Sequence, residues 1–119
     1  MTDAPGTSPE QLAALIESGD AEVIDVRTDA EWAAGHIAGT RHVPFERLVA
    51  EAGDLDRSRP IVFYCRSGDR SAAAAQALTA SGWTAVTSLD GGLVAWVEHG
   101  LPLEPADGQV VEPSALPPS

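Results

Sequence analysis

Short apolar runs alternate along the chain with segments in which apolar residues recur at helical spacing. The runs rich in β-branched and aromatic residues predict buried strands at residues 22–26, 61–64 and 83–89, with a further extended stretch at 41–43. Helical spacing predicts helices at residues 8–19, 28–35, 45–51, 71–81 and 93–99. Strands that alternate with helices favour a parallel sheet with helices on both faces, so the pattern predicts an α/β fold.

Two of these helices begin with residues that can cap them. Ser8 and Thr28 each stand three positions before a residue, Gln11 or Glu31, whose side chain can bond back to the capping backbone. Pro9 adds a fixed backbone angle at the first helical position. These capping boxes place the two helix starts independently of the apolar spacing.

The length and composition allow one folded domain. Of the 119 residues 44% are apolar, which is ordinary for a chain with a single hydrophobic core. Residues 1–7 precede the first helix as an N-terminal extension, and the regular pattern covers residues 8–104. Proline and small polar residues dominate residues 105–119, so we expect a disordered tail there.

The charge balance is strongly acidic and limits the partners. Acidic residues number 18 against seven basic ones, and the formal charge of −11 argues against binding to nucleic acid or to an anionic membrane. The first residues contain neither a basic nor a long apolar segment, so we expect no signal peptide, no membrane span and a reducing, cytoplasmic location. The single cysteine excludes an intrachain disulfide, and the three scattered histidines have no metal-ligand spacing.

That cysteine, Cys65, directly follows the predicted strand 61–64 and precedes a loop and a helix. Open α/β sheets place their ligand sites at this edge, where a helix N-terminus offers unpaired backbone N–H groups to an anion. Arg66 and Arg70 add positive charge on either side. Because such surroundings stabilise a thiolate, we expect Cys65 to be a nucleophile that is ionised at neutral pH.

The other residues of the loop are candidate binding groups. We expect Arg70 to contact an anionic substrate, whereas Arg66 fits that role and a surface role equally well. The Ser67 and Ser71 hydroxyls can donate to a sulfur anion and can also stabilise the turn and the helix start. Asp69 belongs to the same loop but is assigned no chemistry, since it can pair with either arginine or cap the helix.

Three more polar residues lie where strands or helices end. Asp25 and Arg27 lie at the carboxyl end of the predicted strand 22–26, and we expect them to form a structural pair behind the site. His36 is a candidate general base for the cysteine. We favour a structural role for His36, because a thiolate that the loop already stabilises needs no base.

Taken in order, these pieces resemble the single-domain rhodanese family of sulfurtransferases over residues 8–104. The resemblance rests on five motifs: Asp25-Val26-Arg27; Glu31 with Gly35-His36-Ile37 and Gly39; Cys65-Arg66-Ser67-Gly68-Asp69-Arg70-Ser71; Gly91-Gly92 with Trp96; and Gly100-Leu101-Pro102. It implies a doubly wound parallel sheet of about five strands with helices on both faces. It also implies that Cys65 takes the outer sulfur of a small anionic donor, either thiosulfate or a persulfide, and holds it as a persulfide of its own.

In the family the sulfur then passes to cyanide or to a thiol, and a protein thiol is a further candidate acceptor. The resemblance implies no cofactor. The loop N–H groups from Arg66 to Ser71, Gly68 included, would hold the terminal sulfur anion, while Arg66 and Arg70 would guide the donor.

Two alternatives use the same loop. A cysteine-based phosphatase or arsenate reductase places one more residue between cysteine and arginine than the four that separate Cys65 from Arg70, and Asp69 would repel a phosphate dianion. The other alternative is a module that carries sulfur without turnover or binds anions for sensing. A mass spectrum before and after thiosulfate, and again after cyanide, separates it from a sulfurtransferase.

Overall fold

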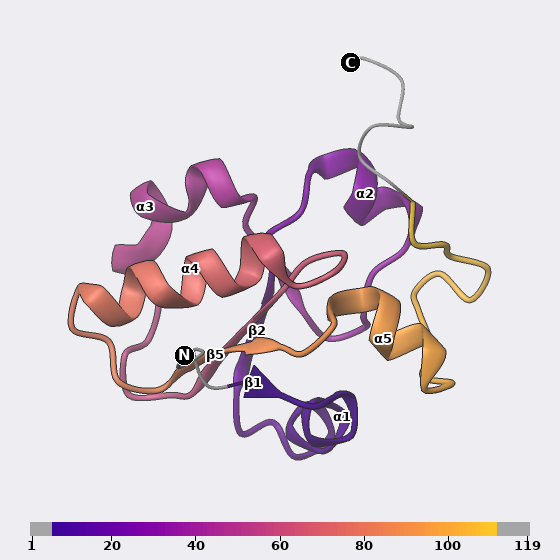
Figure 1. Cartoon of the computed structure of the whole chain (residues 1–119), viewed down its shortest axis with the longest axis horizontal. Helices are drawn as coiled ribbons and strands as arrows, with labels where there is room; N and C mark the ends of the chain where they lie inside the picture. Colours follow the sequence, from indigo (N-terminus) through magenta and orange to yellow (C-terminus); the bar gives the residue numbers. More distant parts are fainter. Residues whose placement is uncertain (1–5, 112–119) are drawn as a thin grey trace.

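A computed structural model describes residues 6–111 and shows a five-stranded, wholly parallel sheet in the order β1-β5-β4-β2-β3. The strands are β1 (Gly6–Thr7), β2 (Glu22–Asp25), β3 (Arg41–His42), β4 (Ile61–Tyr64) and β5 (Val86–Leu89). The direction in which successive strands are added reverses at the centre of the sheet, between β2 and β4. The helices that connect the strands on the two sides of this point therefore pack on opposite faces of the sheet. The structure confirms the predicted α/β class and the doubly wound sheet (Figure 1).

Helices cover both faces of this sheet. They are α1 (Pro9–Ser18), α2 (Asp29–Ala34), α3 (Leu48–Glu51), α4 (Asp69–Ala80) and α5 (Gly92–Glu98), and 3-10 turns at Phe45–Arg47 and Ala52–Asp54 flank α3. None of the helices in the described part of the chain is long and apolar enough to cross a membrane.

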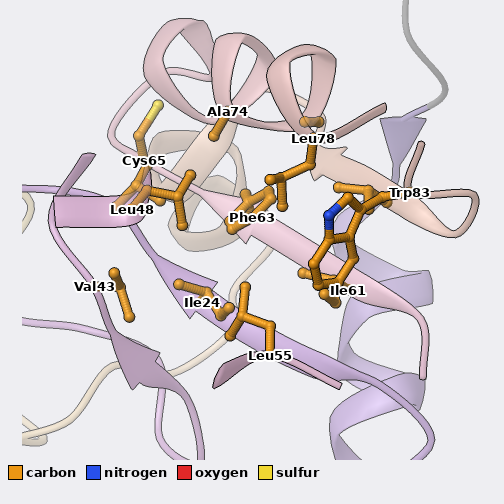
Figure 2. Packing of buried hydrophobic residues seen from close by; sticks show 13 residues of the cluster. Ile24, Val43, Leu48, Leu55, Ile61, Phe63, Cys65, Ala74, Leu78 and Trp83 are labelled. Carbon is orange, nitrogen blue, oxygen red and sulfur yellow. The ribbon is translucent and has the colours of Figure 1, made fainter. Parts of the chain in front are cut away.

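The core is divided by the sheet into two clusters. One cluster joins alternate residues of the central strands to α3 and α4, with Phe63 fully buried and Trp83 closing one end (Figure 2). The other joins the opposite strand faces to α1 and α5 through Leu12, Leu93 and Trp96. Cys65 belongs to the first cluster, so the thiol is carried by a residue that is packed into the core.

Both predicted capping boxes are present. Ser8 Oγ accepts from Gln11 N, and the Gln11 side chain accepts from Ser8 N. Thr28 and Glu31 make the equivalent pair at the start of α2.

Several boundaries differ from the sequence prediction. Helix α4 begins at Asp69 and not at Ser71, because Gly68 takes a left-handed φ of 112° and serves as the N-cap. Strand β5 begins at Val86, three residues later than predicted. Gly6 and Thr7, which the sequence analysis placed in an N-terminal extension, pair with β5 as an edge strand. This two-residue strand is too short to show an apolar pattern.

Residues 105–111 contain no helix or strand, yet they contact the domain. Immediately before them, Glu104 exchanges two backbone hydrogen bonds with His36, of 2.7 and 3.0 Å. Gln109 N donates to Ala34 O at 2.8 Å, and Val110 packs against the second core cluster. The segment thus lies over the end of α2, while the rest of the predicted tail, residues 112–119, is outside the described residues.

Candidate active site

The Cys65 side chain lies in a cradle of hydrogen-bond donors at the carboxyl end of β4. Its Sγ accepts from Gly68 N at 3.1 Å and from Ser71 N at 3.4 Å, and Ser71 Oγ lies 3.5 Å away. Cys65 is only 1% exposed and Ser71 is fully buried. Two amides and a hydroxyl at the start of a 12-residue helix form a site for a negatively charged sulfur.

Helix α5 keeps the cysteine loop in this conformation. Leu93 N donates to Cys65 O at 2.8 Å and Val94 N donates to Arg66 O at 3.0 Å. The backbone N–H groups of the first turn of α5 therefore donate hydrogen bonds to the first two carbonyl groups of the loop. This close approach requires glycine at position 92, where a Cβ would lie 2.5 Å from Arg66 O and 2.7 Å from Cys65 O.

Arg70 points from the loop helix toward α2. Its Nη1 donates to Glu31 Oε1 at 2.8 Å and its Nη2 to Glu31 Oε2 at 3.0 Å, so the guanidinium and carboxylate pair in a bidentate manner. Glu31 is fully buried, whereas the Arg70 side chain is 31% exposed. Burial raises the pKa of the Glu31 carboxyl, but hydrogen bonds from Arg70 and Thr28 outweigh it and hold the pKa below its usual range.

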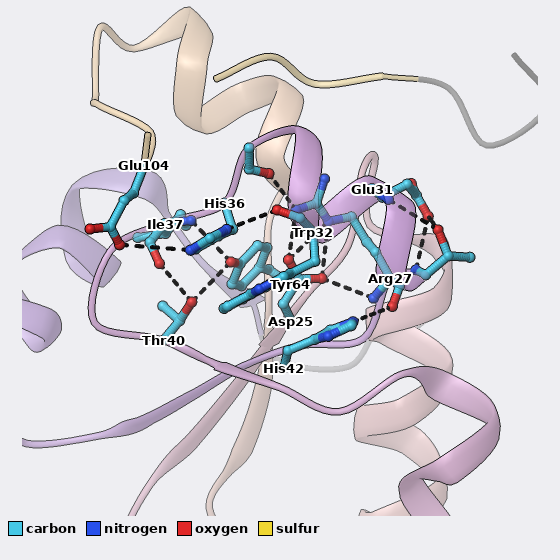
Figure 3. A network of polar contacts seen from close by, with 12 residues as sticks. Asp25, Arg27, Glu31, Trp32, His36, Ile37, Thr40, His42, Tyr64 and Glu104 are labelled. Carbon is cyan, nitrogen blue, oxygen red and sulfur yellow. Dashed lines mark hydrogen bonds and ion pairs between the residues drawn. The ribbon is translucent and has the colours of Figure 1, made fainter. Parts of the chain in front are cut away.

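Asp25 and Arg27 form a fully buried ion pair at the end of β2 (Figure 3). Arg27 Nη2 donates to Asp25 Oδ2 at 2.7 Å and to Gly35 O at 2.7 Å, which ties the strand to the end of α2. The pair packs on Tyr64, whose ring centre lies 5.9 Å from the Arg27 guanidinium carbon. These contacts hold the carboxyl end of β2 against the end of α2, which is a structural role.

The histidines of this region make local contacts. His36 Nδ1 lies 2.8 Å from Trp32 O, and the two rings stack at 3.6 Å between centroids. His42 stacks on the same tryptophan and lies 2.8 Å from Arg27 O through Nε2. Among residues 6–111 no group of three His, Cys, Asp or Glu side chains is placed to hold a metal ion.

The remaining loop residues border the cradle. Arg66 is half-buried, and Ser67 and Asp69 are exposed. A pocket of about 320 Å³ adjoins the loop, and its lining includes Ser67, Gly68, Asp69, Ser88 and Asp90. The structure thus brings all of residues 65–71 to one place and sets Asp25 and Arg27 beside it.

Sequence reasoning missed two neighbours of the loop. Glu31 was interpreted as a helix cap, and its capping role is real, but the pattern contains no sign that it also binds Arg70, 39 residues away. Ser88 Oγ lies 2.7 Å from Ser71 Oγ, and a lone serine in a strand offers no sequence signal at all.

A doubly wound sheet with a thiol held by backbone amides beside its central strand defines a cysteine-dependent α/β domain. The sequence model of the Rhodanese-like domain family matches residues 8–99, so the chain belongs to this family. The resemblance drawn from the five sequence motifs is therefore confirmed.

Relatives with assigned activities cover most of the chain. A thiosulfate sulfurtransferase GlpE of Pseudomonas fluorescens is 39% identical over 108 residues, which is 91% of this chain and 97% of that protein. A sulfurtransferase of Allochromatium vinosum is 36% identical over 94 residues, or 79% of this chain and 88% of that protein. The solution structure of a rhodanese-like domain from Anabaena has a TM-score of 0.76 at 29% identity, covering 97% of this chain and 87% of that one. These similarities support rhodanese-type sulfur transfer in general.

Proposed function

We propose that the protein is a thiosulfate sulfurtransferase that carries sulfane sulfur as a persulfide on Cys65. The observation that supports this most directly is the cradle around Sγ, formed by the amides of Gly68 and Ser71 and the Ser71 hydroxyl. These donors stabilise a thiolate before the reaction and can stabilise the terminal sulfur anion after it.

In the first step the Cys65 thiolate attacks the outer sulfur of thiosulfate. The S–S bond of the donor breaks, sulfite leaves with the bonding electron pair, and Cys65 retains a persulfide anion. The cradle is nearly closed to solvent, so a donor has to present a small terminal atom. A sulfane sulfur meets this requirement better than a tetrahedral phosphoryl group, which argues against the phosphatase alternative.

In the second step cyanide or a thiolate attacks the terminal sulfur. The persulfide S–S bond breaks, thiocyanate or a new persulfide leaves, and the Cys65 thiolate is regenerated. No external oxidant or reductant is needed, because one sulfur atom moves between two nucleophiles. The reaction requires a reduced Cys65, which suits the reducing cytoplasm.

The anionic donor has to approach an acidic protein. With a formal charge of −11, the molecule as a whole repels thiosulfate, so local positive charge is needed at the loop. Arg66 and Arg70 are the basic residues of the loop. Glu31 offsets part of the Arg70 charge, which makes the Glu31–Arg70 pair a determinant of donor affinity.

The test combines mass spectrometry with turnover. Thiosulfate should add one sulfur atom to the wild-type protein, cyanide should remove it, and Cys65→Ser should gain none, since a serine hydroxyl does not ionise at neutral pH. Because Cys65 is the chain's single cysteine, the added mass can be assigned without further mapping. A wild-type protein that gains no sulfur contradicts the proposal.

Steady-state assays separate the remaining alternatives. Continuous thiocyanate formation identifies an enzyme, whereas a single equivalent of thiocyanate identifies a stoichiometric sulfur carrier. Hydrolysis of an aryl phosphate that depends on Cys65 would identify a phosphatase instead.

A further inference from the structure

Ser88, at the carboxyl end of β5, adds a second hydroxyl group next to that of Ser71 in the cysteine cradle. Its Oγ lies 2.7 Å from Ser71 Oγ, which in turn lies 3.5 Å from Cys65 Sγ. Ser88 is 7% exposed and Ser71 is fully buried, so water competes little for either hydroxyl. The three atoms form a chain that runs from strand β5 across to strand β4.

The number of hydroxyl protons determines which of these atoms donates a hydrogen bond and which accepts it. Each hydroxyl has one proton to donate. Ser71 Oγ can give its proton to Cys65 Sγ, to Gly68 O at 3.2 Å or to Ser88 Oγ. Gly68 O and an ionised sulfur can only accept, so Ser88 is the neighbour in this set that can also donate to Ser71.

Ser88 is free to act as that donor. Among residues 6–111, Ser71 Oγ is the acceptor within hydrogen-bond distance of Ser88 Oγ. When Ser88 donates, the Ser71 proton is not spent on Ser88 and is left for the two acceptors, Gly68 O and Cys65 Sγ. Of these the ionised sulfur carries the full negative charge, and donation into a hydroxyl oxygen strengthens the bond which that hydroxyl makes.

We propose that Ser88 is a positioning residue for sulfur transfer: it donates to Ser71, which turns the Ser71 proton away from Ser88 and makes it available to the Cys65 thiolate. A role of Ser88 in sulfur transfer rests on the proposed sulfurtransferase function. The effect of Ser88 on the Cys65 thiolate, in contrast, can be measured without a sulfur donor. Among residues 6–111, the hydrogen bonds to Cys65 Sγ come from the loop and α4 and not from Ser88, so Ser88 reaches the sulfur through Ser71.

Removing the Ser88 hydroxyl leaves the charges around Cys65 in place. Those charges come from the loop and α4, from α2, from the end of β2 and from the turn after β5: Arg66, Asp69, Arg70, Glu31, Asp25, Arg27 and Asp90. A shift in thiolate formation after Ser88→Ala would therefore report the hydroxyl chain and not a changed charge.

The experiment measures the rate of Cys65 alkylation by iodoacetamide as a function of pH. Loss of an oriented donor disfavours the thiolate, so the midpoint of the profile should rise by about half a pH unit in Ser88→Ala. Ser88→Thr should restore the wild-type midpoint, since it keeps the hydroxyl and Ser88 borders the 320 Å³ pocket, where an added methyl group has room.

Thr87→Ala is the matched control. Thr87 is the preceding residue of β5, and its hydroxyl pairs with Thr7 at 2.6 Å rather than with the cradle. The Thr87→Ala variant should be less stable than the wild type but should keep the wild-type alkylation midpoint. An equal shift in Thr87→Ala, or a Ser88→Thr profile like that of Ser88→Ala, would show a general effect of the strand and overturn the proposal.

A double-mutant cycle tests whether Ser88 acts through Ser71. The effect of Ser88→Ala should vanish in a Ser71→Ala background, because the chain is already broken there. A full effect in that background, or an unshifted Ser88→Ala profile, contradicts the role of Ser88. If wild type gains no sulfur from thiosulfate but the midpoint shift is observed, the proposed function fails while the hydroxyl chain stands.

Discussion

Arg70 of the cysteine loop is bound by Glu31 of α2 through two hydrogen bonds of 2.8 and 3.0 Å. The pair joins a fully buried carboxylate to a guanidinium that is 31% exposed at the rim of the site. It therefore has two effects of different kinds. It holds α2 against the loop, and it reduces the positive charge that an approaching anion meets.

These two effects can be separated with Glu31→Gln and Arg70→Ala. Both variants should lose about 2 kcal/mol of folding free energy, because Glu31 is the buried partner: Arg70→Ala leaves its carboxylate without the guanidinium, and Glu31→Gln places an amide NH2 group against that guanidinium. Their KM values for thiosulfate should move in opposite directions. Glu31→Gln frees the Arg70 charge and should lower KM about threefold, whereas Arg70→Ala leaves the Glu31 charge and should raise KM by a similar factor.

Glu22→Gln is the control for the charge change. Glu22 begins β2, at the opposite edge of the sheet, and pairs with Arg59 at 3.6 Å. Its replacement should leave KM unchanged at moderate salt. Unchanged KM values in both Glu31→Gln and Arg70→Ala would reduce the pair to a structural contact and leave donor capture to the backbone amides and Arg66.

The Glu31–Arg70 pair also shows where sequence reasoning stops. The strand, cysteine, loop and helix were predictable because their signals lie within a few residues of one another, and the two capping boxes were predictable for the same reason. Glu31 is 39 residues from Arg70, and Ser88 is 17 residues from Ser71. Such pairs depend on how strands are ordered in the sheet, which no local pattern encodes.

The helix start at Asp69 was missed for a different reason. Gly68 was interpreted as a loop residue, but its left-handed φ of 112° allows it to cap α4 directly. The prediction of Ser71 as the first helical residue was wrong, and the correction matters chemically. Ser71 is in the first turn of the helix, where both its amide and its hydroxyl reach Cys65 Sγ.

Tyr64 provides a test of the fold at alkaline pH. Its hydroxyl accepts from Ile37 N at 3.1 Å and lies 3.0 Å from Thr40 Oγ1, and burial raises the pKa of the phenol above its usual range. A raised pKa in the folded state means that this contribution to stability is complete below about pH 10 and is lost as the pH rises further. We expect phenolate absorbance to appear only when the protein unfolds.

The measurement is unambiguous because Tyr64 is the one tyrosine of the chain. Phenolate absorbance and far-ultraviolet circular dichroism should change together during an alkaline titration. Tyr64→Phe should lower the free energy of unfolding by about 1–2 kcal/mol at neutral pH, since the buried Ile37 N–H loses its acceptor. At high pH the stability of this variant should decline less steeply than that of the wild type. Phenolate formation in a protein that keeps its full dichroism would contradict this account.

Gly92 links α5 to the cysteine loop, and its substitution tests whether that contact positions the thiol. A Cβ at position 92 would lie 2.5 Å from Arg66 O and 2.7 Å from Cys65 O, so Gly92→Ala has to displace the loop backbone. A displacement near 1 Å at a reacting group can lower a rate about a hundredfold, and we expect a loss of kcat of that order in the thiosulfate assay.

Gly100→Ala separates this steric effect from backbone strain. Gly100 has a φ of 77° against 64° for Gly92, so both substitutions pay the cost of a left-handed alanine, about 1 kcal/mol. A Cβ at position 100 would meet no atom within 4 Å. Gly100→Ala should therefore lose some stability and keep its kcat. If the two variants lose kcat equally, the loss reflects a weakened fold, and the contact of α5 with the Cys65 and Arg66 carbonyls does not control the position of the sulfur.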